Sequence, residues 1–140
     1  MIRFNIISET GRRLPRKKIQ MLMTIMDEEE EPPESTVNII FVNDAAMADL
    51  NRRYRRRRGP TDVLSFNIDD VPGPQSVLGE IYISTDTAAR NAVEAGVSFT
   101  REVLHLCCHG FLHLLGHDHD GDEDFHRMRE REEHYLERTL

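Results

Sequence analysis

The sequence predicts a single α+β domain in which a four-stranded mixed sheet is packed with about five helices. The chain has 140 residues, a length typical of one domain, so we expect residues 1–140 to form one unit. Four short segments are rich in β-branched and aromatic residues, and five longer segments carry apolar residues at helical spacing. Their order is strand, helix, strand, helix, strand, strand and three helices, which favours one sheet covered by helices.

The strands are predicted where short apolar segments are bounded by turn-forming residues: residues 2–7, 37–42, 63–68 and 77–84. The first helix is expected to begin at Pro15, which suits a first helical turn, and to bury four apolar residues: Ile19, Leu22, Met23 and Met26. Acids at the carboxyl end of a helix oppose its dipole. We therefore interpret the acidic residues 27–31 as a solvated loop rather than as an acidic binding site.

Two shorter helices are expected after the second and fourth strands. Asp44 is the expected N-cap of the first, and Thr85 or Asp86 is that of the second, which should stop near Gly96. The inward faces of these helices are expected to hold seven side chains: Met47, Leu50, Tyr54, Ala88, Ala89, Ala92 and Val93.

The segment 99–115 is apolar around most of its circumference, which predicts a central buried helix. Ser98 is its expected N-cap, and Gly116 its left-handed end. Residues 122–140 are rich in Glu and Arg and predict a surface helix with four apolar contacts: Phe125, Met128, Tyr135 and Leu136.

Composition excludes several classes of protein. No stretch approaches the roughly 18 consecutive apolar residues of a membrane span, and the amino terminus does not resemble a signal peptide. We expect a soluble, cytoplasmic protein with no membrane partner. The only two cysteines, Cys107 and Cys108, are adjacent, which excludes a disulfide scaffold.

The formal net charge of -7 argues against a nucleic-acid partner, but the charge is unevenly distributed. Six of the 18 Lys and Arg residues lie within residues 52–58, which we call the arginine segment. This concentration favours phosphate binding. The alternative is a solvated helix end, where cations complement the helix dipole.

A histidine cluster lies on and after the central helix, at positions 105, 109, 113, 117 and 119. His109 and His113 are four residues apart, so both imidazoles can reach one zinc ion from the same helix face. His105 reaches the same point less easily, and its role stays open. The central helix is therefore expected to carry two metal ligands.

The third ligand is expected after the helix, because Gly116 reverses the chain there. Either His117 or His119 can fold back over the histidine face. We favour His119, because more residues separate it from Gly116 and the chain needs that length to return. Three imidazoles leave the fourth tetrahedral position open, as in catalytic zinc sites. Gly110 stands where the HExxH metalloproteases have their glutamate base, which disfavours peptidase chemistry. A glycine inside a helix also indicates close approach of another element or of a substrate.

Residues 109–119, HGFLHLLGHDH, closely resemble the HGxLHLxGYDH signature of the YbeY family, metal-dependent endoribonucleases of ribosomal RNA maturation. Upstream, Asn51, Tyr54, Arg55 and the segment PTDVLSF at 60–66 resemble the family's NxxYRxxxxPTDVLSF stretch. The residues LGEIYI at 78–83 resemble its LGDIxI strand. The chain departs from the family pattern at three places. His117 stands where tyrosine is usual, and Glu80 stands where aspartate is usual. Between Arg55 and Pro60 the chain has three further arginines and a glycine, Arg56 to Gly59.

The resemblance implies that one zinc ion per chain is bound by His109, His113 and His119, and that Arg55 is the catalytic arginine facing the metal. A metal and a guanidinium fork together can stabilise the negative charge that develops on phosphate oxygens during cleavage.

The other side chains near these motifs have supporting roles in this interpretation. Five arginines are expected to bind RNA phosphates: Arg52, Arg53, Arg56, Arg57 and Arg58. Asp118 suits an outer carboxylate that orients a ligand, or alternatively a simple turn. His117 either lines the site or competes as a ligand.

The resemblance implies a single-strand-selective, metal-dependent endoribonuclease that acts in ribosomal RNA processing, 16S rRNA 3′-end maturation and ribosome quality control. Its partners would be ribosomal RNA and ribosomal subunits. Two alternatives stay open. One is a zinc-bearing, RNA-binding ribosome-assembly factor without catalysis, and the other is a metal-dependent hydrolase of peptides or small molecules.

Overall fold

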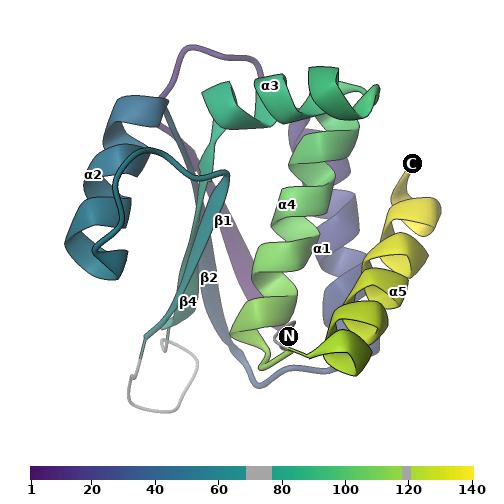
Figure 1. Cartoon of the computed structure of the whole chain (residues 1–140). Coiled ribbons are helices and arrows are strands. Elements are labelled where there is room, and N and C mark those ends of the chain that lie inside the picture. The colour runs from purple at the N-terminus through teal and green to yellow at the C-terminus, as the bar shows by residue number, and fades with distance from the viewer. Residues whose placement is uncertain (69–76, 118–120) are drawn as a thin grey trace.

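The computed structural model describes residues 1–68, 77–117 and 121–140, which form one four-stranded sheet and five helices (Figure 1). The strands are β1 (Ile2–Ser8), β2 (Ser35–Val42), β3 (Val63–Asn67) and β4 (Val77–Ser84). The helices are α1 (Arg16–Glu30), α2 (Asp44–Arg55), α3 (Thr85–Ala95), α4 (Phe99–Leu114) and α5 (Asp122–Thr139). The α+β class and the predicted order of elements are confirmed.

The sheet is mixed, as predicted. Its strands lie in the order β1-β2-β4-β3, with β1, β2 and β4 parallel and β3 antiparallel to β4. Parallel neighbours need long connections, because the chain must return to the same end of the sheet before it can pair again. Helix α1 makes this return between β1 and β2, and α2 together with β3 lies between β2 and β4.

Alternate side chains of the sheet face two separate layers. Ile39 and Phe41 of β2 belong to the main core, together with buried residues of α1, α4 and α5. Their neighbours Ile40 and Val42 pack on the other face, against Met47 of α2. Figure 1 shows the same division, with α2 on one side of the sheet and α1, α4 and α5 on the other.

Helix α4 is the predicted central helix, and it packs very closely on the sheet. A Cβ atom at Gly110 would lie 2.7 Å from Cγ2 of Ile81, so no larger side chain fits there without a shift. Ser65 Oγ donates a hydrogen bond of 3.2 Å to the Gly110 carbonyl, and Asn67 Nδ2 donates one of 2.9 Å to the carbonyl of Leu114. Of the two explanations for Gly110, close approach of another element is the one the structure supports.

The prediction that residues 27–31 form a solvated loop is wrong, because α1 continues to Glu30. The acids have tertiary partners that outweigh the unfavourable dipole. Asp27 accepts a hydrogen bond of 3.0 Å from the backbone amide of Ile2. Glu29 and Glu30 pair with side chains of α5: His134 and Arg138 with Glu29, and Arg131 and Tyr135 with Glu30.

Two helix caps also differ from the prediction. Asn43 rather than Asp44 caps α2, and its side chain accepts a hydrogen bond of 2.9 Å from the Ala46 amide. Ser84 rather than Thr85 or Asp86 caps α3. At both helix starts several residues that can act as caps are adjacent in the sequence. Contacts between the two starts determine which one caps, because Asp44 accepts hydrogen bonds of 2.7 Å from Ser84 and Thr87. The predicted cap of α4, Ser98, is confirmed, and Gly116 follows this helix with a left-handed φ of 97°.

Three side chains predicted to face inward are exposed instead: Tyr54 at 59%, Val93 at 81% and Phe125 at 48%. At α3 the small residues Ala88 and Ala92 make the buried contact, which leaves Val93 on the outer side. Within the described ranges, none of the helices is both long and apolar enough to cross a membrane.

Candidate functional site

Three histidines lie along the side of α4 that faces α5. His105, His109 and His113 come from successive turns and are half-buried, whereas the other residues from Val103 to Leu114 are buried. The ring centroids of His109 and His113 are 4.6 Å apart, and those of His105 and His109 are 6.3 Å apart. The four-residue spacing thus places these rings on one face, as expected.

The closest pair, His109 and His113, is arranged as two ligands of one metal would be. Their Nε2 atoms lie 3.1 Å apart. Two nitrogens that each lie about 2.0–2.1 Å from a tetrahedral zinc ion are separated by about 3.3 Å, so the observed pair fits this geometry with little movement. Imidazole nitrogens also suit the chemistry of zinc.

The third expected ligand, His119, and the outer carboxylate Asp118 lie outside the described residues. Among the residues that are described, no group of three or more His, Cys, Asp or Glu side chains is gathered in a way that could hold a metal ion. The described part of the chain therefore contributes the pair His109 and His113, and the complete ligand set stays a prediction.

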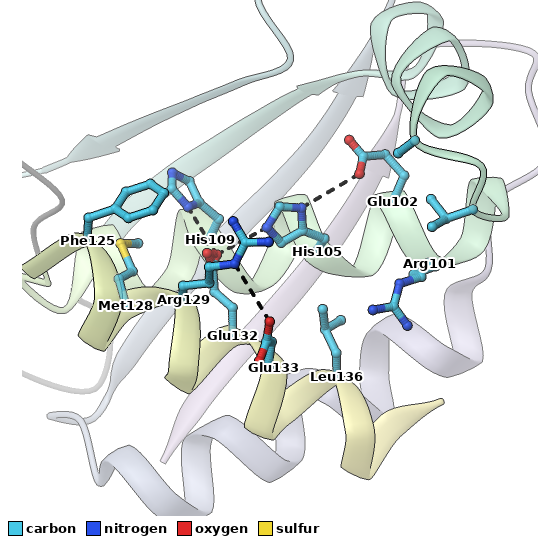
Figure 2. A pocket seen from close by; sticks show the side chains of 12 residues that line it. Arg101, Glu102, His105, His109, Phe125, Met128, Arg129, Glu132, Glu133 and Leu136 are labelled. Atoms are coloured by element: carbon cyan, nitrogen blue, oxygen red, sulfur yellow. Dashed lines mark hydrogen bonds and ion pairs between the residues drawn. The ribbon is translucent and has the colours of Figure 1, made fainter. Parts of the chain in front are cut away.

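A carboxylate that the sequence analysis did not identify joins the histidine face from α5. Oε2 of Glu132 lies 3.1 Å from Nε2 of His105 and 3.4 Å from Nδ1 of His109 (Figure 2). On its other side, Nδ1 of His105 lies 3.6 Å from Oε1 of Glu102. A signal was present in the sequence: Glu132 follows Met128 and precedes Leu136 at four-residue spacing, so it occupies a core-facing position of α5.

These contacts change the protonation equilibria of the groups involved. Glu102 first, and Glu132 second, raise the pKa of His105 to about 9 by hydrogen bonding and charge. Burial opposes ionisation of Glu132, but the hydrogen bonds from His105 and His109 outweigh burial and lower its pKa to about 2. Near neutral pH, His105 is therefore a cation held between two carboxylates.

A cavity of about 390 Å³ lies beside this network, between α4 and α5. Its lining extends from Phe125 and His109 at one end to Arg101 and Val97 at the other, as Figure 2 shows for the labelled side chains. The cavity shares His109 with the expected metal site. A substrate bound at the histidines therefore has room beside it.

His117 contacts a carboxylate of α1. Its Nε2 atom is 3.1 Å from Oε1 of Glu30, the nearly buried carboxylate at the end of α1 that also binds Arg131 and Tyr135. This contact ties the first residue after Gly116 to α1 and α5. Its predicted role near the metal is untested.

The arginine segment lies at the carboxyl end of α2, on the opposite face of the sheet from α4. Arg52 and Arg53 pair with Asp49 at 2.5 and 3.5 Å. Arg55 to Arg58 are exposed, and no hydrogen bond or ion pair of their side chains is found among the described residues. The structure thus describes no contact between Arg55 and the histidines, although α2 and α4 run toward the same end of the sheet (Figure 1).

Comparison with known proteins gives a consistent result. A family model described as Endoribonuclease YbeY matches residues 6–140. The chain is 44% identical over 119 residues to Endoribonuclease YbeY of Desulforamulus reducens, covering 81% of this chain and 78% of the relative. It is 38% identical over 133 residues to Endoribonuclease YbeY of Clostridioides difficile, covering 91% and 87%. The solution structure of TM1509 from Thermotoga maritima matches with a TM-score of 0.66 at 33% identity, over 99% of this chain and 89% of that one.

Proposed function

The chain belongs to the YbeY family, and from this premise we propose that it is a zinc-dependent endoribonuclease that cuts single-stranded regions of ribosomal RNA. The observation that carries the proposal is the pair of Nε2 atoms of His109 and His113, 3.1 Å apart on a half-buried helix face. Two imidazole nitrogens at this separation need only one more ligand to form an open catalytic metal site.

We assign one zinc ion to His109, His113 and His119. When bound, the ion supplies Lewis-acid stabilisation of the negative charge that develops on phosphoryl oxygens during cleavage. The donor chemistry supports this assignment, because zinc binds imidazole nitrogens well, whereas calcium and magnesium prefer oxygen ligands. In this proposal Asp118 and His117 support the ligands from outside.

We assign to Arg55 the binding of the non-bridging oxygens of the scissile phosphate. Its guanidinium is exposed and has no partner among the described residues, so it is available for a bidentate contact with a phosphate. Five further arginines would hold neighbouring phosphates and supply the salt dependence of binding: Arg52, Arg53, Arg56, Arg57 and Arg58. The contrast between this segment and a net charge of -7 supports a localised RNA contact.

The proposed substrate and partners are those that the family resemblance implies. We propose that the protein acts in the cytoplasm on ribosomal RNA within ribosomal subunits, in 16S rRNA 3′-end maturation and in ribosome quality control. Peptide hydrolysis is disfavoured, because Gly110 packs against Ile81 and leaves no room for the glutamate base of an HExxH protease.

The proposal is tested by cleavage of a single-stranded ribosomal RNA fragment with the purified protein. A chelator should abolish cleavage, and added zinc should restore it. His113→Ala should lower the cleavage rate by more than about 100-fold, because a ligand matters at least as much as its outer partners. Arg55→Ala should lower it by about 10²- to 10³-fold, the range for loss of one group that stabilises transition-state charge.

Matched controls are His126→Ala on α5 and Arg13→Ala before α1, two exposed positions outside the proposed ligand set and the arginine segment, which should cleave at the parent rate. Equal cleavage by all five proteins would indicate a contaminating nuclease and contradict the proposal. Absence of cleavage in every sample, together with zinc binding and cosedimentation with ribosomal subunits, would favour the assembly factor without catalysis.

A further inference from the structure

Glu132 is an ionisable side chain in the interior of the molecule, on the face of α5 that packs against α4. Its side chain is only 9% exposed, and its neighbours one turn away, Met128 and Leu136, are buried core residues. A carboxylate in such a place is destabilising unless it is hydrogen-bonded. Its Oε2 atom accepts from both His105 and His109, so the histidine face satisfies it.

The hydrogen bond at His109 determines which ring nitrogen carries the proton. An ionised carboxylate can only accept, so Nδ1 of His109, 3.4 Å from Glu132, must be the donor. In the neutral ring the other nitrogen, Nε2, then has its lone pair unprotonated. This is the atom that faces Nε2 of His113 at 3.1 Å, and a metal ligand needs such a lone pair.

His105 holds the carboxylate in place from the other side. Its Nε2 donates to Glu132 at 3.1 Å, and its Nδ1 lies 3.6 Å from Glu102, one turn earlier on α4. The four side chains thus form a chain from Glu102 through His105 and Glu132 to His109, which Figure 2 shows lining one cavity. With His105 fixed at both nitrogens, Glu132 has little freedom to leave His109.

We propose that Glu132 is a positioning residue, which holds His109 in the tautomer and orientation that present Nε2 to the metal, while Glu102 and His105 hold Glu132. This inference rests on the proposed function for the metal, but its effect on His109 exists in the metal-free protein. It also assigns a purpose to His105, whose role the sequence left open and whose two nitrogens both face carboxylates.

The test compares Glu132→Gln with Glu133→Gln. In the first variant the glutamine keeps the shape of the side chain but can present either a carbonyl oxygen or an NH₂ group to His109, so the tautomer is no longer fixed. Glu133 is the neighbour of Glu132, 61% exposed, and contacts Arg129 at 3.7 Å on the surface. Zinc affinity is measured by competition with a chromophoric chelator, and the tautomer by long-range ¹H–¹⁵N spectra of the histidine rings without metal.

We expect Glu132→Gln to bind zinc about 10- to 100-fold more weakly, the usual effect of losing an outer partner of a ligand. The ring of His109, assigned by comparison with His109→Asn, should change from one tautomer to a mixture. Glu133→Gln should match the parent in both measurements. Unchanged zinc affinity and an unchanged tautomer in Glu132→Gln would overturn the proposal.

Two further measurements separate this inference from a folding defect and from the proposed function. The circular dichroism spectrum of Glu132→Gln should match that of the parent, since the variant is isosteric. If the parent itself binds no zinc, the proposed function fails, whereas the tautomer of His109 in metal-free parent and variant still decides whether Glu132 controls it.

Discussion

The histidine face of α4 and the arginine segment at the end of α2 carry the chemistry expected of this chain, and they are built in opposite ways. His105 and His109 of α4 share one nearly buried carboxylate of α5, and α4 itself is packed closely against the sheet. Arg55 to Arg58 are exposed on the other side of the sheet, with no side-chain partner among the described residues. Packing therefore sets the geometry of the first region, whereas the second presents exposed charge on long side chains.

The largest difference is expected in stability, and two aromatic residues test it. Phe111 beneath the histidines and Tyr54 beside the arginines each contact another aromatic ring edge-on, at 5.3 Å between centroids. Phe111 is fully buried, whereas Tyr54 is 59% exposed. Phe111→Ala should lower the free energy of unfolding by about 3–5 kcal/mol, and Tyr54→Ala by about 1 kcal/mol or less. Urea unfolding of the metal-free proteins measures both, and equal losses would contradict the contrast.

A smaller effect is expected where α4 meets the sheet. Gly110→Ala places a Cβ atom 2.7 Å from Ile81 and 3.0 Å from Oγ of Ser65, so the helix must shift. Such overpacking usually costs about 1–3 kcal/mol, from which the better helix propensity of alanine subtracts about 1 kcal/mol. Thermal and urea unfolding measure the net loss. Gly11→Ala is the control, because nothing lies within 4 Å of its added Cβ atom, and an equal loss there would show that packing is not the cause.

Changes in the arginine segment should alter the salt dependence of RNA binding rather than the stability of the fold. In a cleavage-inactive His113→Ala background, Arg56, Arg57 and Arg58 are changed together to glutamine, and affinity for a single-stranded RNA is measured against NaCl concentration. Each lost phosphate contact should reduce the slope of log affinity against log salt by about 0.7, so the triple change should reduce it by up to about 2. An unchanged slope would show that these arginines do not contact RNA.

The smallest expected effect is a pH dependence of stability that belongs to the histidine face. The pKa of His105 is raised from its ordinary value near 6.5 to about 9, chiefly by Glu102 and Glu132. Its stabilising contribution is therefore complete below about pH 6.5 and is lost as the pH rises through 9. Urea unfolding of the metal-free parent should show this decline between those values, and His105→Gln should show a shallower one. The same decline in both proteins would assign it to other groups.

Glu132 has the opposite sign, because its pKa is lowered to about 2. Its contribution is present above its unfolded value near 4.5 and is lost as the pH falls toward 2. The two groups together stabilise the network most between about pH 4.5 and 6.5. Unfolding in acid, compared between the parent and Glu132→Gln, measures this loss of stability at low pH.

The sequence predicted the parts of the molecule that depend on local pattern. Strands, helices and the pair His109 and His113 follow from apolar periodicity and four-residue spacing, and these signals survive folding because they define faces of single elements. The error at residues 27–31 arose because the partners of Glu29 and Glu30 lie more than 100 residues away on α5. Glu132 was missed because its partners lie on another helix, 27 residues away at His105 and 23 at His109, although its core-facing position on α5 was a readable sign.

The contact between Glu30 and His117 is likewise one that the sequence did not predict. The sequence left open whether His117 lines the site or competes as a ligand, and in the structure its Nε2 lies 3.1 Å from a carboxylate at the end of α1. No local pattern relates residues that are 87 positions apart. The chemistry of one helix face could therefore be predicted, whereas the supports that hold it could not.

The position of Glu132 in the last helix also gives the site an order of assembly. During synthesis the three imidazoles of α4 are made before the carboxylate of α5 that accepts from His109, and the partners of Glu30 on α5 are also made after α4. A nascent or truncated chain without α5 has the histidine pair but lacks the network around it. Maturation of the site is thereby linked to the synthesis of α5, so a chain that stops before this helix lacks the finished network.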